Sequence, residues 1–194
     1  MPQRFDIRKR QRLLSEEREA ALQPEKLLRD LGLSEGMTFA DIGCGPGFFT
    51  IPAAKIVGEH GHALAADIQG EMLSTVRSRA LEHGLSNVRI VKTNDREIPI
   101  APGSCDYALL AFTLHEIEHR ASFLHRAART LKPGGRMIII EWDKAQGPIG
   151  PPLEDRITPE ELAADAQAAG LRQMEERTLA SDQYLRVYEQ HTQA

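Results

Sequence analysis

The sequence predicts an α/β fold: a single domain of 194 residues with a doubly wound, mostly parallel sheet. From residue 37 onward, short apolar runs alternate with segments of helical periodicity. The first apolar run leads directly into three glycines, Gly43, Gly45 and Gly47, and a helical pattern follows them at once. A strand, a glycine-rich turn and a helix in this order present backbone N–H groups at a strand's carboxyl end, where a nucleotide-like or amino-acid-like ligand can bind.

The first 34 residues precede this alternation and are expected to form two helices. Charged side chains dominate the first helix, near residues 3–20, and a solvated basic tail is the alternative for residues 1–15. Pro24 marks the start of the second helix and Gly32 marks its end.

Five strands and two further helices are expected in the alternating part of the chain. The strands lie near residues 37–42, 62–67, 88–92, 105–112 and 135–141. A helix beginning at Glu71 has one apolar face, formed by Met72, Val76, Ala80 and Leu81. A second helix lies near residues 120–131, and Pro133-Gly134-Gly135 ends it. Alternation of this kind places helices on both faces of the sheet.

Residues 158–194 are expected to form a helix and a hairpin. Thr158 is a typical N-cap residue and Pro159 suits the first helical position. Two strand-like runs follow, at residues 171–179 and 184–190. Before this helix, the Gly- and Pro-rich stretch 143–157 follows the fifth strand, so we expect it at the carboxyl edge of the sheet, where ligands bind.

Charge and hydropathy argue against several classes of protein. The net charge of −4 and the isoelectric point of about 6.0 give no overall attraction to nucleic acid or to an anionic membrane. The apolar runs have only strand length, so no membrane span is expected, and the first residues lack the apolar region of a signal peptide. Cys44 and Cys105 should lie at opposite ends of the sheet, unable to pair. These features predict a cytoplasmic protein.

Five motifs in a fixed order carry a resemblance to a known family. The glycine loop is not the G-x-G-x-x-G of dinucleotide-binding folds, because Phe48 stands at the last glycine position. The loop has the form D-x-G-x-G-x-G, headed by Asp41, and is followed by HALAADIQ, TNDREIPI, CDYALLAFTLHE and LKPGGRMIIIEW. Together these segments resemble class I S-adenosylmethionine-dependent methyltransferases, most closely small bacterial members of the menaquinone and ubiquinone biosynthesis type.

The resemblance implies a Rossmann-like, seven-stranded sheet, mostly parallel, with one antiparallel strand supplied by the C-terminal hairpin. It also divides the single domain into working parts. Residues 37–142 would bind the cofactor, S-adenosylmethionine, and residues 143–157 would lie on the side of the substrate, a small-molecule methyl acceptor. The helices of residues 1–34 would form a lid beside or over the cofactor.

Nine residues are candidates for binding that cofactor: Asp41, Gly43, Gly45, Gly47, Asp67, Ile68, Asp95, Ala111 and Phe112. Asp67 ends the second apolar run about 20 positions past the last glycine, where a carboxylate can accept both ribose hydroxyls. By resemblance, Asp41 orders the loop and approaches the methionine amino group.

Three further assignments follow from the same resemblance. Ile68 would pack on the adenine, with plain core packing as the alternative. Asp95 would accept the adenine amino group, unless the adjacent Asn94 does. Ala111 and Phe112 end the fourth strand, where a backbone carbonyl commonly takes the methionine ammonium.

His115, Glu116 and His119 form an H-E-x-x-H run that is also typical of a zinc site. Two features argue against zinc: the glycine turn before the third ligand is missing, with Ser122 in its place, and the first histidine should fall on a strand-to-helix turn. We therefore expect no metal. In the resembled family this loop borders the acceptor, so His115 and Glu116 are candidate catalytic residues; polar side chains at a helix start are the alternative.

Trp142 is a candidate substrate contact, with a core position under the hairpin as the alternative. The resemblance predicts methyl transfer to a small molecule by in-line displacement and leaves the accepting atom open. Two other functions stay in view: an NAD-type oxidoreductase, disfavoured by Phe48, and a SAM-binding protein without catalysis. The oligomeric state is not predicted.

Overall fold

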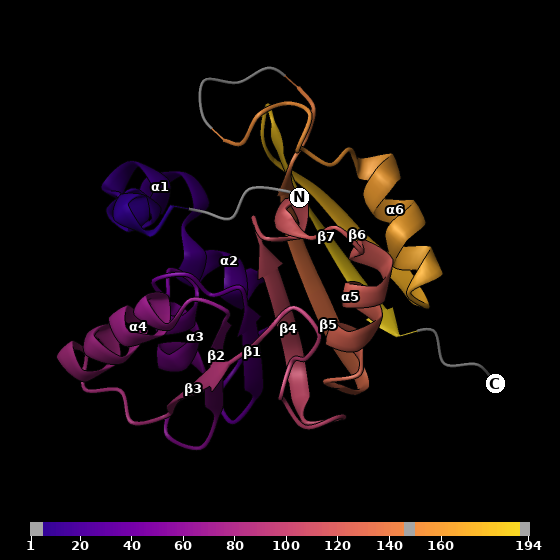
Figure 1. Ribbon diagram of the computed structural model, residues 1–194. Helices are drawn as coiled ribbons and strands as arrows, with labels where there is room; N and C mark the ends of the chain where they lie inside the picture. The colour runs from indigo at the N-terminus through magenta and orange to yellow at the C-terminus, as the bar shows by residue number, and fades with distance from the viewer. Residues whose placement is uncertain (1–5, 146–149, 191–194) are drawn as a thin grey trace.

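Seven strands form one sheet in the order β3-β2-β1-β4-β5-β7-β6 (Figure 1). The computed structural model describes residues 6–145 and 150–190. The strands are β1 (Thr38–Ile42), β2 (His62–Asp67), β3 (Val88–Lys92), β4 (Cys105–Ala111), β5 (Leu131–Trp142), β6 (Leu171–Ala180) and β7 (Gln183–Gln190). Strand β7 runs antiparallel to both of its neighbours, and the other pairs are parallel. The predicted fold class is confirmed.

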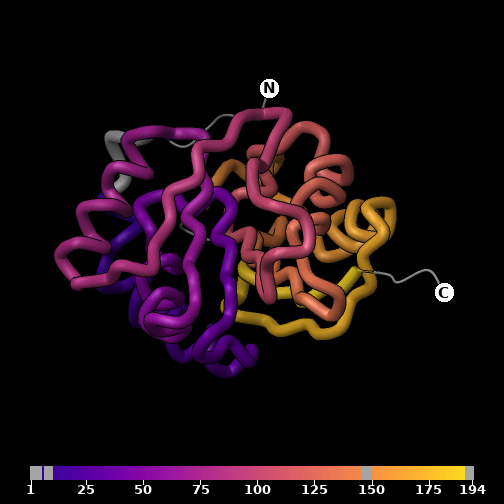
Figure 2. The backbone as a smooth tube through the Cα atoms, turned by 90° about the horizontal axis from the view of Figure 1, so that it is seen from below, coloured from indigo at the N-terminus to yellow at the C-terminus, as the bar shows by residue number. Residues whose placement is uncertain are grey.

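Helices cover both faces of this sheet. They are the 3-10 helices η1 (Ile7–Leu14) and η2 (Leu114–Glu116), and the α-helices α1 (Glu16–Leu22), α2 (Pro24–Asp30), α3 (Thr50–Val57), α4 (Gly70–Glu82), α5 (Arg120–Ala128) and α6 (Pro159–Ala168). Helices α2, α3 and α4 lie on one face, and α5 and α6 lie on the other (Figure 1). Figure 2, a view from below, shows the indigo and violet N-terminal half mainly on the left of the molecule and the orange and yellow C-terminal half on the right.

The central strands β4 and β5 are buried on both faces. Leu109 packs in the cluster beneath α2 and α3, and its neighbour Leu110 packs in the cluster beneath α5 and α6. Ile138 and Ile139 divide in the same way, and all four side chains have 0% exposure. Strands covered on both faces need continuous apolar runs, and this explains why ALLA and MIIIE could be recognised in the sequence.

Local signals set several helix ends as predicted. The hydroxyl of Thr158 accepts a hydrogen bond from the Glu161 backbone, and the Glu161 carboxylate accepts one from the Thr158 N–H, which makes a capping box at the start of α6. Pro24 begins α2, and Gly32, with φ of +96°, follows its end. Near the N-terminus the expected single helix is instead a 3-10 helix followed by α1, and residues 1–5 lie outside the described chain.

Two expectations were wrong. Leu81 was placed on the buried face of α4, but it is 82% exposed, and Leu73 is buried on that helix. Helix α5 ends at Ala128 rather than near residue 131, so Pro133-Gly134-Gly135 lies inside β5. The register between β4 and β5 is irregular at this point, which is where a strand tolerates a proline that lacks an N–H.

The two cysteines lie as predicted. Cys44 follows the carboxyl end of β1 and Cys105 begins β4, so they occupy opposite ends of the sheet. Both are buried and neither is in a disulfide. Over the described residues, the structure has no helix that is both long enough and apolar enough to cross a membrane.

Candidate functional site

The glycine loop between β1 and α3 is held close to the ends of both neighbouring strands. Gly43, Gly45 and Gly47 have φ values of +76°, +51° and +83°, which L side chains rarely adopt. The Gly43 N–H donates to Ala66 at the end of β2. A Cβ at Gly43 would lie 2.4 Å from Thr113 Cγ2, just beyond β4, so only glycine permits this approach.

Asp67 lies at the end of β2 with its carboxylate against the glycine loop. The Gly45 N–H donates to Asp67 Oδ2 at 2.9 Å, and the Gln69 N–H donates to Oδ1 at 2.7 Å. Burial raises the pKa of Asp67, and these backbone hydrogen bonds oppose the rise. A carboxylate oxygen can accept more than one hydrogen bond, so each oxygen of Asp67 can still accept one from a hydroxyl group. The geometry therefore suits a diol, although the ribose contact itself stays a prediction.

Asp41 points into the protein rather than across the loop. It is 2% exposed, and the Thr50 hydroxyl at the start of α3 donates to Asp41 Oδ2 at 2.6 Å. Burial raises the pKa of Asp41 to about 7. This hydrogen bond connects β1 to α3, the two elements that flank the glycine loop, which agrees with a role in ordering the loop. Contact of Asp41 with a ligand's amino group stays a prediction.

The two residues expected near an adenine lie on the adjacent loops. Ile68 is half-buried, and its carbonyl accepts a hydrogen bond from Lys92. Asp95 is exposed in the loop between β3 and β4. Asn94 Oδ1 accepts the backbone N–H groups of Arg96 and Glu97, so the Asn94 side chain is engaged in its own turn. The contact of Asp95, or of Asn94, with an adenine amino group stays a prediction.

The chain leaves β4 through Ala111 and Phe112. Phe112 has a φ of +55°, which is strained for an aromatic residue, and its N–H donates to Ile140 of β5 at 2.8 Å. The strained turn places the Phe112 ring 5.1 Å from the Trp142 ring. The aromatic side chains at the ends of β4 and β5 thus pack against each other at the carboxyl edge of the sheet.

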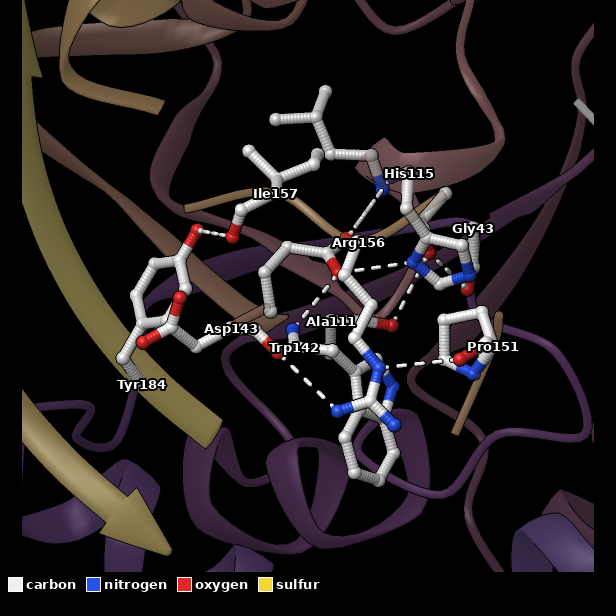
Figure 3. Close-up of polar contacts among 12 residues, drawn as sticks. Gly43, Ala111, His115, Trp142, Asp143, Pro151, Arg156, Ile157 and Tyr184 are labelled. Carbon is white, nitrogen blue, oxygen red and sulfur yellow. Dashed lines mark hydrogen bonds and ion pairs between the residues drawn. The ribbon is translucent and has the colours of Figure 1, made fainter. Parts of the chain in front are cut away.

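Glu141, which sequence reasoning missed, organises the turn after β4. Its side chain is fully buried near the end of β5. Oε1 accepts the N–H groups of Leu114 and His115 at 2.7 and 3.2 Å, and Oε2 accepts the Trp142 N–H at 3.2 Å. The His115 ring completes the set, with Nδ1 2.9 Å from Oε2 (dashed lines in Figure 3).

His115 is consequently held in one orientation. Because a carboxylate only accepts, Nδ1 carries the hydrogen and Nε2 of the neutral ring is left as an acceptor. The side chain is 10% exposed. Burial alone would lower the pKa of His115, but the Glu141 charge and hydrogen bond outweigh it, and the pKa lies above its ordinary value. The arrangement is that of a general base oriented by a carboxylate.

The H-E-x-x-H run does not lie on one helix. His115 and Glu116 are on η2, as expected for a strand-to-helix turn, and His119 is exposed at the start of α5. His125 contacts the Ala169 carbonyl near the end of α6. Within residues 6–145 and 150–190 no three His, Cys, Asp or Glu side chains are grouped as a metal site would require.

Trp142 is half-buried at the edge of the sheet, between Phe112 and Arg156. The buried Arg156 guanidinium lies 5.3 Å from the indole ring and donates to the carbonyls of Asp143 and Pro151 (Figure 3). It also forms an ion pair with Asp182. Arg156, also missed from the sequence, thereby fixes the described parts of the 143–157 loop. The substrate role of Trp142 stays a prediction.

The N-terminal segment approaches the glycine loop from above. A Cβ at Gly45 would lie 3.6 Å from Leu13 Cδ1, and Arg18 of α1 lies against Phe48 in the loop. In Figure 1, α1 lies near the end of the sheet toward which the β4 arrow points. The role of this segment as a lid stays a prediction.

Comparison with known sequences places these features in a family. Residues 15–150 match the model of the ubiE/COQ5 methyltransferase family. The chain is 35% identical over 114 residues to the ubiquinone/menaquinone biosynthesis C-methyltransferase UbiE of Azotobacter vinelandii, covering 58% of this chain and 45% of that protein. The Vibrio cholerae protein of the same name is 35% identical over 123 residues, covering 63% and 46%. The match thus spans less than half the length of these relatives.

Solved structures extend the likeness to nearly the whole chain. A SAM-dependent methyltransferase from Aquifex aeolicus superposes with a TM-score of 0.90 at 32% identity, covering 95% of this chain and 98% of that one. A geranyl diphosphate C-methyltransferase from Streptomyces coelicolor, at 19% identity and a TM-score of 0.73, shares the fold.

Proposed function

The chain belongs to the ubiE/COQ5 methyltransferase family, and from this premise we propose that it transfers a methyl group from S-adenosylmethionine to a small-molecule acceptor. The observation that carries the proposal is the cradle formed by the glycine loop and Asp67. At Gly43 only a residue without a Cβ fits beside Thr113, and Asp67 presents both carboxylate oxygens beside the loop. These residues fit a ligand that carries a diol and lies close to the backbone of the loop.

Within this proposal, each candidate cofactor residue has a defined task. Asp67 accepts the ribose hydroxyls, Ile68 and Asp95 flank the adenine, and the carbonyl at Ala111 or Phe112 receives the ammonium. Asp41 keeps the loop in position through Thr50. The sulfonium methyl group is already activated, so the protein chiefly needs to align an acceptor with it and exclude water.

On the acceptor side, we assign the central role to His115. Glu141 fixes the ring so that Nε2 can take a proton from an acceptor whose nucleophilic atom carries one. Glu116 contacts the acceptor from the same turn, and the Phe112 and Trp142 rings, tilted by 44° to each other, provide an apolar wall. Such a wall suits an aromatic acceptor with a hydroxyl group, the class to test first since the sequence relatives are named for quinone biosynthesis.

The proposal is tested by calorimetric titration with S-adenosylhomocysteine. We expect binding to the wild-type protein and at least tenfold weaker binding to Asp67→Ala, since hydrogen bonds to a charged group contribute about 1.5–3 kcal/mol. Asp30→Ala is the control, because Asp30 is an exposed carboxylate paired only with Lys26 on α2 among described residues. Undiminished affinity of Asp67→Ala would remove Asp67 from the site.

Two alternatives are separated by further measurements. An NAD-type oxidoreductase has no support from the family match, and NAD should produce no heat in the same titration. A protein that binds the cofactor without catalysis would transfer no labelled methyl group to any component of a metabolite extract. Labelled product that disappears in His115→Ala, with S-adenosylhomocysteine affinity retained, would establish both transfer and the acceptor side of the site.

The setting we propose for this reaction is the cytoplasm. Two buried, unpaired cysteines accord with a reducing compartment. The overall negative charge accords with a small-molecule acceptor rather than nucleic acid.

A further inference from the structure

Arg18 on α1 has surroundings unlike those of the exposed arginines near it. Its guanidinium carbon lies 4.6 Å from the centre of the Phe48 ring and 5.2 Å from the centre of the Phe112 ring. The side chain is half-buried, and burial lowers its pKa to about 10, so it stays charged at neutral pH. A cation is therefore held between one ring from the glycine loop and one ring from the end of β4.

Among the described residues, no Asp or Glu pairs directly with this cation. Its hydrogen bond goes from Nη1 to the Leu13 carbonyl at 3.2 Å, and in the described chain it forms no ion pair with any Asp or Glu. Asp41 is the carboxylate that acts on it electrostatically, but Asp41 points toward Thr50. A guanidinium has five N–H donors, so most of them are left for a ligand.

The location limits which ligand this is. Phe48 follows Gly47 directly, and Phe112 follows the last residue of β4, where the methionine ammonium is expected. An amino acid bound there carries a carboxylate on the carbon next to its ammonium. The partner that the fold brings within reach of Arg18 is therefore the α-carboxylate of the cofactor's methionine part.

We propose that Arg18 binds the carboxylate of the amino-acid part of S-adenosylmethionine, and that the N-terminal segment in this way supplies part of the cofactor site. The inference rests on the proposed function. The rings keep the guanidinium in place by cation–π contact, and the carboxylate pairs with its N–H groups. In addition to its expected role as a lid, the N-terminal segment thus contributes a specific contact with the cofactor's carboxylate.

Two ligands that differ in this carboxylate provide the test. S-adenosylhomocysteine carries the amino acid, whereas 5′-methylthioadenosine has the same adenosine and sulfur without it. In Arg18→Gln we expect S-adenosylhomocysteine to bind at least about tenfold more weakly, as for loss of a charge-assisted hydrogen bond. Binding of 5′-methylthioadenosine should not change. Arg18→Lys, which keeps the charge and loses the planar fork, should give an intermediate loss.

The control is Arg12→Gln, which removes the same charge from an exposed position of η1 and should leave both affinities unchanged. Equal weakening of both ligands by Arg18→Gln would mean that Arg18 only holds the segment in place, and this would overturn the proposal. Unchanged affinity for both ligands would overturn it as well. Wild-type protein that binds neither ligand would refute the proposed function itself, and the assignment of Arg18 with it.

Discussion

Replacing Glu141 with glutamine changes which nitrogen of His115 carries the hydrogen. The two oxygens of Glu141 accept four N–H groups, two at each oxygen. A glutamine must place its NH2 group at one of these positions. At Oε1 it would face two backbone N–H groups, from Leu114 and His115. At Oε2 it would face the Trp142 N–H and the His115 ring, and the ring can change tautomer and accept.

Placing the NH2 group at the Oε2 position costs less, so this placement determines the expected loss of stability. One buried donor, the Trp142 N–H, loses its acceptor, which costs about 1–3 kcal/mol. Conversion of the remaining charge-assisted bonds to neutral ones adds about 1 kcal/mol. A total loss of roughly 2–4 kcal/mol is tolerable for a domain whose stability is typically about 5–15 kcal/mol. Glu141→Gln should therefore fold, with hydrogen on Nε2 of His115 and no acceptor left for a substrate proton.

The pH dependence of stability follows from the raised pKa of His115. A folded pKa above the unfolded value means that the His115–Glu141 pair stabilises the protein fully below about pH 6.5. This contribution is lost as the pH rises through the folded pKa. The stability difference between wild type and Glu141→Gln should thus be largest in mild acid and shrink at higher pH. Methyl transfer by the wild type should rise with pH over the same range, since the base must be neutral.

Urea unfolding at several pH values measures the stability terms, and NMR of nitrogen-labelled histidine identifies the tautomer. Glu118→Gln is the matched control, because Glu118 is exposed on the same connection between β4 and α5. If Glu141→Gln keeps the hydrogen on Nδ1 and retains the wild-type pH slope, Glu141 does not orient the ring. Full methyl transfer by this variant, with a known acceptor, would contradict the assignment of His115 as the base.

Two further predictions concern the glycine loop. Gly43→Ala should abolish measurable S-adenosylhomocysteine binding in titration, because its Cβ would lie 2.4 Å from Thr113 at a φ of +76°; wild-type affinity would show that the loop can move away from β4. Asp41, with a folded pKa of about 7 against 3.8 in the unfolded chain, favours folding most when protonated. Its contribution should fall by about 4 kcal/mol as the pH rises from 4 to above 7. Asp41→Asn keeps an acceptor for Thr50 and should remove this slope in urea unfolding; a slope equal to the wild type would assign the pH dependence to other groups.

The strands and the glycine loop could be predicted because their signals are local in the sequence. Buried strands need unbroken apolar runs, and a positive φ needs glycine, so a few adjacent residues suffice. Where a local signal competes with packing, prediction failed. Pro133-Gly134-Gly135 has the composition of a turn, yet β5 pairs through it by an irregular register. Leu81 fits the helical period of α4, but it is 82% exposed.

The residues missed in the site act across long separations. Glu141 and His115 are 26 positions apart, and their pairing depends on which strands are neighbours. One signal was present, since Glu141 ends the buried run MIIIE and a charge in such a run needs partners. Arg18 had no such signal. It stands among charged residues in EEREAAL, and only its contacts with Phe48 and Phe112 distinguish it from them.

Phe112 connects the two halves of the proposed site. Its ring contacts Arg18 on the cofactor side at 5.2 Å and Trp142 on the acceptor side at 5.1 Å. A non-glycine residue at positive φ costs about 1–3 kcal/mol, and it persists only where its surroundings impose it. Here the N–H bond to Ile140 and the contact between Thr113 and Gly43 fix the chain on both sides of the residue. The strained turn holds one ring between the two proposed binding regions, so the point of methyl transfer that we propose lies just beyond the end of β4.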